Sequence, residues 1–346
     1  MVRRLDDLTV MKTCDPSDMM SQITSFPDQL EWGRGLQMEE FSGVGNVVIC
    51  GIGGSAIAGD IITDLLTPTC KNPIITSRSV TLPGFADAST LALAISYSGN
   101  TAESLSLYED AMRRGCRVMV ITSGGELERL ALKNSQPLLK VPGGNQPRAS
   151  LGYLLGASAL ALQKAGLCHL HRDILAAVPD LRSYLQGLAA EEPANHNQAK
   201  KIALALREGV AAIYAPRNVR SVALRWQNQI NENSKAVAFC GEIPEMNHNQ
   251  LVGWLEGGRG CSCRPVFLLP SDLHPTMRKM TEVTLQMFNE RGLDPLMVQL
   301  PGDSVLDNML QGVVLGDMVS YYLAVLKGVD PAPVAAIKEF KSRICF

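Results

Sequence analysis

The sequence carries almost no excess charge of either sign. Its 32 lysines and arginines are offset by 34 aspartates and glutamates, which leaves a formal net charge of -2 at pH 7. A charge this close to zero gives no electrostatic reason to expect nucleic acid or an acidic membrane surface as a partner. The hydrophobic content of 46% and the charged content of 19% are typical of a chain that forms a soluble core, and 346 residues suffice for roughly two domains.

Long apolar runs are also missing. None reaches the roughly 18 residues that a membrane-spanning helix requires. The first residues lack the basic and apolar pattern of a secretory signal peptide. From these two absences we expect a cytoplasmic protein.

The nine cysteines form no metal-binding pattern. Most of them stand inside apolar runs, as Cys50 and Cys240 do, which predicts buried free thiols in a reducing compartment. Cys261 and Cys263 are separated by a single residue, whereas the cysteine pairs of a zinc site are separated by two. We therefore expect no zinc site.

Nucleotide-binding motifs are incomplete. Residues 51–56, Gly-Ile-Gly-Gly-Ser-Ala, follow the β-branched run 46–50 and come close to the dinucleotide-binding fingerprint. That fingerprint also requires an acidic residue about twenty positions further on, where residues 72–78 contain no carboxylate. The G-x4-G-K-[ST] spacing of a P-loop is absent as well. The sequence therefore predicts binding of neither NAD nor a nucleoside triphosphate.

What the sequence does contain is a group of hydroxyls at one turn. Residues 96–101, Ser-Tyr-Ser-Gly-Asn-Thr, follow the apolar run 91–95, which indicates a buried strand, and precede apolar residues at helical spacing. In an open α/β sheet such a turn lies at the carboxyl edge of the strands, where ligands bind. Hydroxyls together with the N–H groups of a helix start form a cradle for a phosphate. The alternative is a Ser/Thr-rich helix cap without a ligand.

Two further places in the first half could contribute to the same ligand site. The glycines of residues 51–54 let the backbone approach a ligand closely, and Ser55 adds a hydroxyl at a helix start. Arg148 stands just before an expected helix over residues 151–165. It lies either at the same sheet edge or on the surface as a solvent-facing or capping arginine.

Strands and helices alternate along the whole chain. We expect strands at residues 46–50, 91–95, 118–122, 138–141, 210–214, 236–239, 266–269 and 295–300. We expect helices at residues 151–165, 169–190, 198–207, 276–291 and 305–326, with others beginning near residues 56, 102, 126 and 218. This alternation predicts an α/β fold with two parallel, doubly covered sheets and a ligand cleft between them.

The expected domain organisation follows from breaks in this pattern. Residues 1–40 carry two expected helices that wrap onto the core and take no part in chemistry. The remaining segments are a first sheet domain, a helical linker, a second sheet domain and a C-terminal helix or tail that contributes to the active site: residues 41–167, 168–194, 195–330 and 331–346. His169 and His171 lie two apart on the linker helix and so point to different faces, which argues against a metal site there.

Two polar stretches of the second half carry groups suited to acid–base chemistry. Glu232 stands at the end of an expected helix, where the negative end of the helix dipole favours proton uptake by a carboxylate, as a general base requires. His248 lies in a polar turn sixteen positions later. Each residue alone has a plainer alternative, because Glu232 could be a capping or solvated glutamate and His248 a hydrogen-bonded loop histidine.

Taken together, these stretches resemble one family, the bifunctional phosphoglucose/phosphomannose isomerases. That family belongs to the wider phosphoglucose isomerase group, which is built from two sugar-isomerase (SIS) domains. The matching pieces occur in the family's order from about residue 45 to the end: residues 51–55, 96–101, 147–149, 231–233, 247–249 and, more weakly, 337–341. The resemblance implies two SIS-type domains with doubly wound, flavodoxin-like parallel sheets.

The resemblance also implies a reaction and a set of residues. The reaction is interconversion of glucose 6-phosphate, and of mannose 6-phosphate, with fructose 6-phosphate through a cis-enediol, without a metal or organic cofactor. Glu232 would move the proton between C2 and C1, and Arg148 would stabilise the enediolate. His248 would assist ring opening, with Lys341 as a second polar helper. The phosphate would rest on Gly54, Ser55, Ser96, Ser98 and Thr101. A homodimer is implied, because in this group the histidine usually reaches the site from the neighbouring subunit.

Several points stay open at the level of sequence. Lys338 and Lys341 lie three apart on one helix face, so either could be the C-terminal active-site lysine. The family's use of the C2 epimer is linked to a small hydroxyl residue near that lysine, and residues 333–336, Pro-Val-Ala-Ala, offer none. The alternative functions are a non-catalytic SIS-domain regulator that binds a sugar phosphate and an isomerase for another sugar phosphate.

Overall fold

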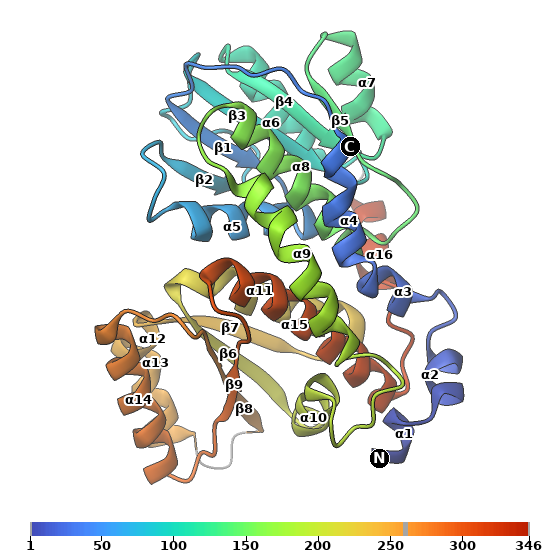
Figure 1. The fold of residues 1–346 in the computed structure, drawn as a ribbon, viewed down its shortest axis with the longest axis vertical. Helices are drawn as coiled ribbons and strands as arrows, with labels where there is room; N and C mark the ends of the chain where they lie inside the picture. Colours follow the sequence, from blue (N-terminus) through green and yellow to red (C-terminus); the bar gives the residue numbers. More distant parts are fainter. Residues whose placement is uncertain (1, 259–261, 345–346) are drawn as a thin grey trace. The chain divides into compact units, whose positions relative to one another are not determined.

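The computed structural model describes residues 2–258 and 262–344 (Figure 1). The chain divides into two compact units, each built on one parallel sheet. The first-sheet unit comprises Thr24–Arg182 and Val305–Asp307. The second-sheet unit comprises Met1–Ile23, Ser183–Ser304 and Asn308–Phe346.

The sheet of the first-sheet unit has the strand order β2-β1-β3-β4-β5, and all of its strand pairs are parallel. Its strands are β1 (Asn46–Cys50), β2 (Ile74–Ser77), β3 (Thr90–Ser96), β4 (Arg117–Thr122) and β5 (Leu138–Lys140). This order is the flavodoxin-like one, in which the chain changes direction across the sheet between β1 and β3. The carboxyl ends of β1 and β3 are therefore the expected place for a ligand, because ligands of such sheets bind at that switch point.

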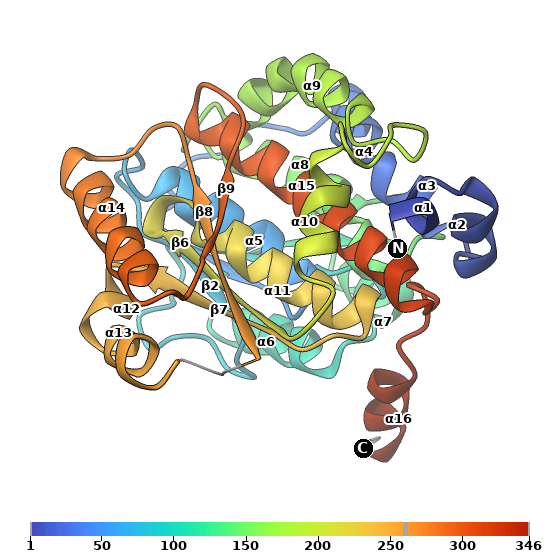
Figure 2. The same cartoon turned by 90° about the horizontal axis from the view of Figure 1, so that it is seen from below.

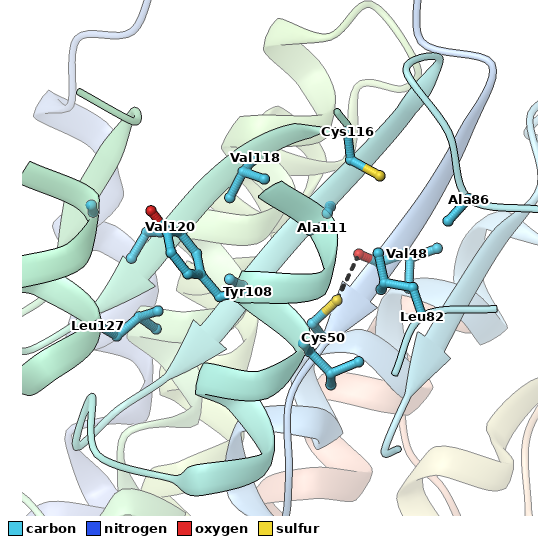
Figure 3. Close-up of a cluster of buried hydrophobic side chains, with 14 residues drawn as sticks. Val48, Cys50, Leu82, Ala86, Tyr108, Ala111, Cys116, Val118, Val120 and Leu127 are labelled. Carbon is cyan, nitrogen blue, oxygen red and sulfur yellow. Dashed lines mark hydrogen bonds between the residues drawn. The ribbon is translucent and has the colours of Figure 1, made fainter. Parts of the chain in front are cut away.

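Helices cover both faces of this sheet. Along the chain they are α4 (Phe26–Trp32), η1 (Gly33–Gly35), α5 (Gly54–Leu66), α6 (Ala102–Arg113), α7 (Gly125–Lys133), η2 (Pro147–Ala149), α8 (Leu151–Lys164) and α9 (Leu170–Gln186). Figure 3 shows one face of the sheet, where Val118 and Val120 of β4 meet Tyr108 of α6 and Leu127 of α7. Cys50 belongs to this cluster, and burial raises the pKa of its thiol to about 12.

The second-sheet unit has a smaller sheet of the same type. Its order is β7-β6-β8-β9, again wholly parallel, with β6 (Val210–Pro216), β7 (Ala238–Ile243), β8 (Cys263–Leu269) and β9 (Leu296–Gln299). The helices α12 (Glu245–His248), α13 (Gln250–Val252), η4 (Gly253–Gly257) and α14 (Pro275–Glu290) lie on one face (Figure 2). The other face is covered by α10 (Gln198–Ala205), η3 (Arg217–Val219), α11 (Arg220–Ser234) and α15 (Val305–Lys327).

Buried polar contacts join α11 to α15. The Trp226 indole N–H donates to the carbonyl of Gly312, and the guanidinium of Arg225 donates to both carboxylate oxygens of Asp317, with distances of 2.9 and 2.7 Å. Among the described residues, α15 is the one helix long and apolar enough by composition to cross a membrane, but 94% of its most apolar window is buried inside the structure. Such burial is typical of a core helix.

The termini and one strand differ from the sequence-based expectation. The described residues 2–40 hold four short α-helices where two are expected, because α1 (Val2–Leu5) and α2 (Leu8–Cys14) precede α3 (Met19–Thr24) and α4. Strand β7 runs over Ala238–Ile243, later than residues 236–239, because its polar second half still pairs with β6. The chain ends in α16 (Ala335–Arg343).

The cysteines are less buried than the sequence suggests. Cys50 and Cys116 are buried, but the other described cysteines, Cys240 among them, are half-buried. All seven described cysteines are free thiols. Cys240 is less buried than expected because it lies on β7, an edge strand that has a neighbouring strand, β6, on one side only. The pair Cys261 and Cys263 lies partly outside the described residues.

Candidate active site

Two turns meet at the carboxyl edge of the first sheet. One joins β1 to α5 and contains Gly54 and Ser55; the other joins β3 to α6 and contains residues 97–101. The backbone N–H of Tyr97 donates to the Ser55 hydroxyl at 3.2 Å, which ties the two turns together. The structure therefore places the two expected phosphate-binding stretches side by side, at the switch point of the sheet.

The hydroxyls of the β3–α6 turn first stabilise the turn itself. Ser96 Oγ accepts from the N–H of Gly99 at 3.1 Å and donates to Thr101 Oγ1 at 3.3 Å. Ser98 is exposed at the tip of the turn. Thr101 is the N-cap residue of α6 but makes no side-chain capping bond. Gly53, the N-cap of α5, has no side chain to cap with. The structure therefore shows no side-chain cap at the start of either helix. Backbone N–H groups at a helix start suit an anion.

Arg148 belongs to the same edge of the sheet. It lies in the short turn η2, and only 3% of its surface is exposed, so it does not face solvent. A Cβ atom added at Gly54 would stand 3.2 Å from Cα of Arg148 and 3.3 Å from the Pro147 carbonyl oxygen. The glycine thus lets the β1–α5 turn pack directly on the backbone of the arginine turn. The first-sheet unit brings together Gly54, Ser55, Ser96, Ser98, Thr101 and Arg148.

Glu232 lies in a pocket of the second-sheet unit. It stands in the last turn of α11 and is half-buried. The pocket measures about 540 Å³ and is lined by Asn231, Glu232, Lys235 and the segment Pro333 to Ile337. That segment leads into the C-terminal helix α16, which begins at Ala335, and it supplies only apolar side chains. The pocket thus places a carboxylate beside an apolar wall, within reach of a bound ligand. A carboxylate positioned at a ligand is the group a general base requires.

His248 occupies a different part of the second-sheet unit. It ends the short helix α12, directly after β7, and its side chain is exposed. The residues of this region are held by polar contacts: Asn249 donates to Glu245, and the Tyr214 hydroxyl donates to Gln250 at 2.7 Å. Burial raises the pKa of the Tyr214 hydroxyl, so it stays a proton donor. His248 is not among the described residues that line the Glu232 pocket.

Comparison with known proteins identifies the family. The model of the bacterial phospho-glucose isomerase C-terminal SIS domain matches residues 195–344. A bifunctional phosphoglucose/phosphomannose isomerase of Caldicellulosiruptor bescii is 33% identical over 334 residues, which cover 94% of this chain and 98% of that protein. One of Aquifex aeolicus is 33% identical over 326 residues, covering 93% of this chain and 97% of that protein. The chain belongs to the bifunctional phosphoglucose/phosphomannose isomerases.

Solved structures agree on the fold of this isomerase family member. The C-terminal domain of a glucosamine-fructose-6-phosphate aminotransferase from Francisella tularensis superposes with a TM-score of 0.69 at 15% sequence identity, over 90% of this chain and 97% of that chain. At that identity the likeness concerns the fold alone. The expected SIS-type architecture with two parallel sheets is confirmed.

Lys235, for which the sequence indicated no role, lies beside Glu232 in the structure. Its Nζ donates to the carbonyl oxygen of Glu232 at 2.7 Å and to that of Pro331 at 3.0 Å. The lysine thereby ties the end of α11 to the segment that forms the pocket wall. The signal available in the sequence was a lysine at a helix end, where such side chains bond the last carbonyls.

The C-terminal lysines lie on α16, beyond the pocket lining. Lys338 and Lys341 are both exposed, and α16 has no buried residue. The helix begins in the wall of the Glu232 pocket, so Lys338 directly follows the last lining residue, Ile337, and Lys341 lies about one turn further along. Their spacing keeps both open as the active-site lysine of this isomerase.

Proposed function

We propose that this protein interconverts glucose 6-phosphate, and mannose 6-phosphate, with fructose 6-phosphate. The observation that carries the proposal is Glu232, a carboxylate in an apolar-walled pocket at the end of α11, in a chain that belongs to this isomerase family. The uncapped, hydroxyl-rich turns at the edge of the first sheet support it, because they suit the 6-phosphate that all three sugars share.

The phosphate is bound by hydroxyls and backbone N–H groups. Ser55, Ser98 and Thr101 offer hydroxyls, Gly54 offers its N–H, and Ser96 holds the turn in shape through its bonds to Gly99 and Thr101. Fixing the phosphate at one end of the sugar orients the reacting carbons at the other end, which removes much of the entropic part of the barrier.

Glu232 transfers the proton. In the open-chain aldose it takes the proton from C2, and the electron pair of the broken C2–H bond forms the C1–C2 double bond of a cis-enediolate. The same proton then returns to C1, while a hydroxyl proton passes from the oxygen on C2 to the oxygen on C1. No electron leaves the sugar, so the reaction needs no external oxidant or reductant, and we propose that it needs no metal or organic cofactor.

Three cationic or titratable groups assist. Arg148, a fixed cation with little contact with water, stabilises the negative charge of the enediolate. His248 assists ring opening as a proton carrier. Lys341, or Lys338 one turn earlier, acts as the second polar helper at the ring oxygen.

We further propose a cytoplasmic homodimer in which His248 serves the partner subunit. The edge strand β7 exposes 62% of Phe239, and Val237, the residue just before the strand, is 54% exposed. The strand leads into α12, which ends at His248. An uncovered edge strand with exposed large apolar side chains is suited to pairing with another chain. An exposed histidine next to such an edge is well placed to reach a partner. Residues 41–167 and 195–330 are the two proposed SIS domains of each subunit.

The composition of the pocket wall should affect which hexose 6-phosphate the enzyme prefers. The residues from Pro333 to Ala336 contain no hydroxyl, and all of them line the Glu232 pocket. A wall without a hydroxyl offers the C2 epimer no extra hydrogen bond. We therefore expect glucose 6-phosphate to be turned over faster than mannose 6-phosphate.

A panel assay tests the function. Purified protein is given each hexose 6-phosphate in turn with a metal chelator present, and product is coupled to a dehydrogenase. Turnover of glucose 6-phosphate in the chelator supports the proposal. Tight binding of fructose 6-phosphate without turnover would point to a sugar-phosphate-binding regulator. Turnover of a different sugar phosphate alone would assign another substrate.

A further inference from the structure

A buried tyrosine, Tyr97, holds the loop that comes just before the turn carrying Arg148. The Tyr97 hydroxyl donates to the carbonyl of Pro142 at 3.0 Å and accepts from the backbone N–H of Asn145 at 3.2 Å. Both bonded residues lie in the loop that leads into η2. One phenol oxygen therefore fixes the path of the chain into the arginine turn.

The same tyrosine is part of the hydroxyl-rich stretch. Its backbone N–H donates to Ser55, and its carbonyl accepts from the N–H and the hydroxyl of Ser123, at 3.1 and 2.6 Å. Its backbone thus belongs to the candidate phosphate site, while its side chain belongs to the arginine loop. Removing the hydroxyl alone would leave every one of the backbone contacts in place.

On the side that follows Arg148, the turn is held by an amide from the N-terminal segment. Gln29 of α4 is buried; its Nε2 donates to the carbonyl of Ala149 at 2.7 Å, and its Oε1 accepts from the N–H of Gly152 at 3.0 Å. A Cβ atom at Gly152 would stand 2.6 Å from Cβ of Gln29, so the glycine permits this close approach. Helix α4 is therefore more than a wrap around the core.

We propose that the Tyr97 hydroxyl and the Gln29 amide are positioning groups for Arg148. They hold the backbone immediately before and after η2, and so fix where the guanidinium lies. This inference rests on the proposed function, in which Arg148 stabilises the enediolate. A displacement of about 1 Å of such a group costs on the order of 100-fold in rate, so weak contacts that prevent it have a large effect on kcat.

The direct test is Tyr97→Phe with Tyr108→Phe as its matched control. Tyr108 is also buried, and its hydroxyl also joins a carbonyl to a donor, here Leu130 O and Asn134 Nδ2. It lies on α6 and packs against α7, in the core cluster of Figure 3 and not in the arginine loop. We expect Tyr97→Phe to lower kcat by ~10- to 100-fold with KM changed by less than ~3-fold, and Tyr108→Phe to change neither.

A second experiment tests whether the loss of kcat in Tyr97→Phe depends on Arg148. In an Arg148→Ala background, assayed at high enzyme concentration, Tyr97→Phe should cost less than ~2-fold more, because the group it positions is gone. A full additional loss would show that Tyr97 acts by another route and would overturn the inference. Gln29→Met keeps the helix and the volume but removes the hydrogen bonds to Ala149 and Gly152, together with the one from Nε2 to the Ser25 hydroxyl. It should show the same KM-against-kcat pattern.

A third arm does not depend on activity. Backbone hydrogen exchange at Asn145 should be at least ~10-fold faster in Tyr97→Phe than in Tyr108→Phe. If the wild-type protein isomerises no sugar phosphate, the proposed function fails, and this arm still reports whether Tyr97 holds the loop. If the wild-type protein is active but Tyr97→Phe matches Tyr108→Phe in both kcat and exchange, the positioning role fails while the function stands.

Discussion

At the scale of single residues, Gly99 is the position where the candidate phosphate turn tolerates least change. Its φ is +69°, and a Cβ atom there would lie 1.7 Å from the carbonyl oxygen of Gly124. Gly115 has the same φ of +69°, but nothing lies within 4 Å of the Cβ it would carry. The two glycines thus share the conformational demand and differ only in the space around them.

We predict that Gly99→Ala destabilises the protein much more than Gly115→Ala. The left-handed conformation costs about 1–2 kcal/mol in either variant. Gly99→Ala must also push apart two backbone segments, which should bring its loss of unfolding free energy above about 3 kcal/mol. Urea unfolding of both variants measures the difference. Equal losses of unfolding free energy in the two variants would mean that the turn accommodates the added methyl group at Gly99 without strain, and would contradict the prediction.

Lys235 is a second residue whose role can be tested. It adopts φ of 50° and ψ of 39°, a left-handed conformation that disfavours side chains other than glycine. The two carbonyls that its Nζ bonds, those of Glu232 and Pro331, give the position a reason to keep a lysine. Glycine would adopt this backbone conformation at lower cost, but it could not donate to the carbonyls of Glu232 and Pro331.

We predict that Lys235→Met lowers kcat by ~10-fold or more, because the Glu232 backbone and the pocket wall lose their common donor. The overall fold should be retained, since the Lys235 side chain is exposed apart from these contacts. Lys201→Met, an exposed lysine on α10 of the same unit, is the control and should leave kcat unchanged. Steady-state kinetics and circular dichroism of both variants decide the matter; a wild-type kcat in Lys235→Met would remove this role.

Single residues also show where sequence reasoning stops. The hydroxyls at residues 96–101 and the glycines at 51–54 could be identified because a glycine- or serine-rich turn after a buried strand has a recognisable local pattern. The bond from Gln29 to Ala149 could not, because it joins residues 120 positions apart. Contacts of that kind depend on tertiary packing, which no local pattern encodes.

At the scale of elements, the contact between α9 and η1 should respond to pH. His171 of α9 is buried against Gly33, and its Nε2 has no hydrogen-bond partner among the described residues. Burial, and secondarily the charge of Arg34, lowers the pKa of His171 below its usual value. The folded protein therefore holds this imidazole neutral under conditions in which the unfolded chain would protonate it.

The sign of the effect follows from linkage. A lowered pKa in the folded state means that below about pH 6.5 the unfolded chain binds more protons, so stability falls as pH falls, by at most about 1.4 kcal/mol per pH unit for one proton. The contribution is fully present above about pH 6.5. We predict that His171→Gln shows a flatter loss of unfolding free energy between about pH 7.5 and 5.5 than the wild type. His196→Gln, at an exposed histidine, is the control; identical pH dependence in all three proteins would contradict the prediction.

Among the elements, the central ones could be predicted and the peripheral ones could not. Strand β1 matches its expected bounds and α8 differs by one residue at its end, because long apolar segments with clear turn residues are unambiguous. The short helices before residue 24 depend on local capping, as where Asp7 accepts from Thr9 and Val10 and begins α2. Periodicity cannot detect helices of four to seven residues.

At the scale of the whole molecule, the proposed homodimer makes two inactive variants complement each other. Glu232→Gln removes the base of its own subunit, and His248→Ala removes the histidine offered to the partner. In a mixed dimer one site carries both defects and the other carries neither. We predict that mixing the variants in equal amounts, with exchange of subunits, restores about a quarter of wild-type activity, since half of the dimers are mixed and each has one intact site.

The result separates the possible arrangements of the histidine. No recovery, in a mixture shown by light scattering and mass spectrometry to contain mixed dimers, would mean that His248 serves its own subunit. Phe239→Lys on the edge strand gives an independent check, because a charge on this exposed apolar side of the proposed interface should yield monomers.

The central claim is that Glu232 moves a proton between the two carbons of a sugar phosphate. Its most direct measurement is deuterium incorporation at C2 of glucose 6-phosphate in deuterated water, followed by nuclear magnetic resonance, for the wild type and Glu232→Gln. We expect deuterium at C2 with the wild type, and exchange reduced by ~10²- to 10⁴-fold with Glu232→Gln while fructose 6-phosphate still binds. Exchange at the wild-type rate in Glu232→Gln would contradict it.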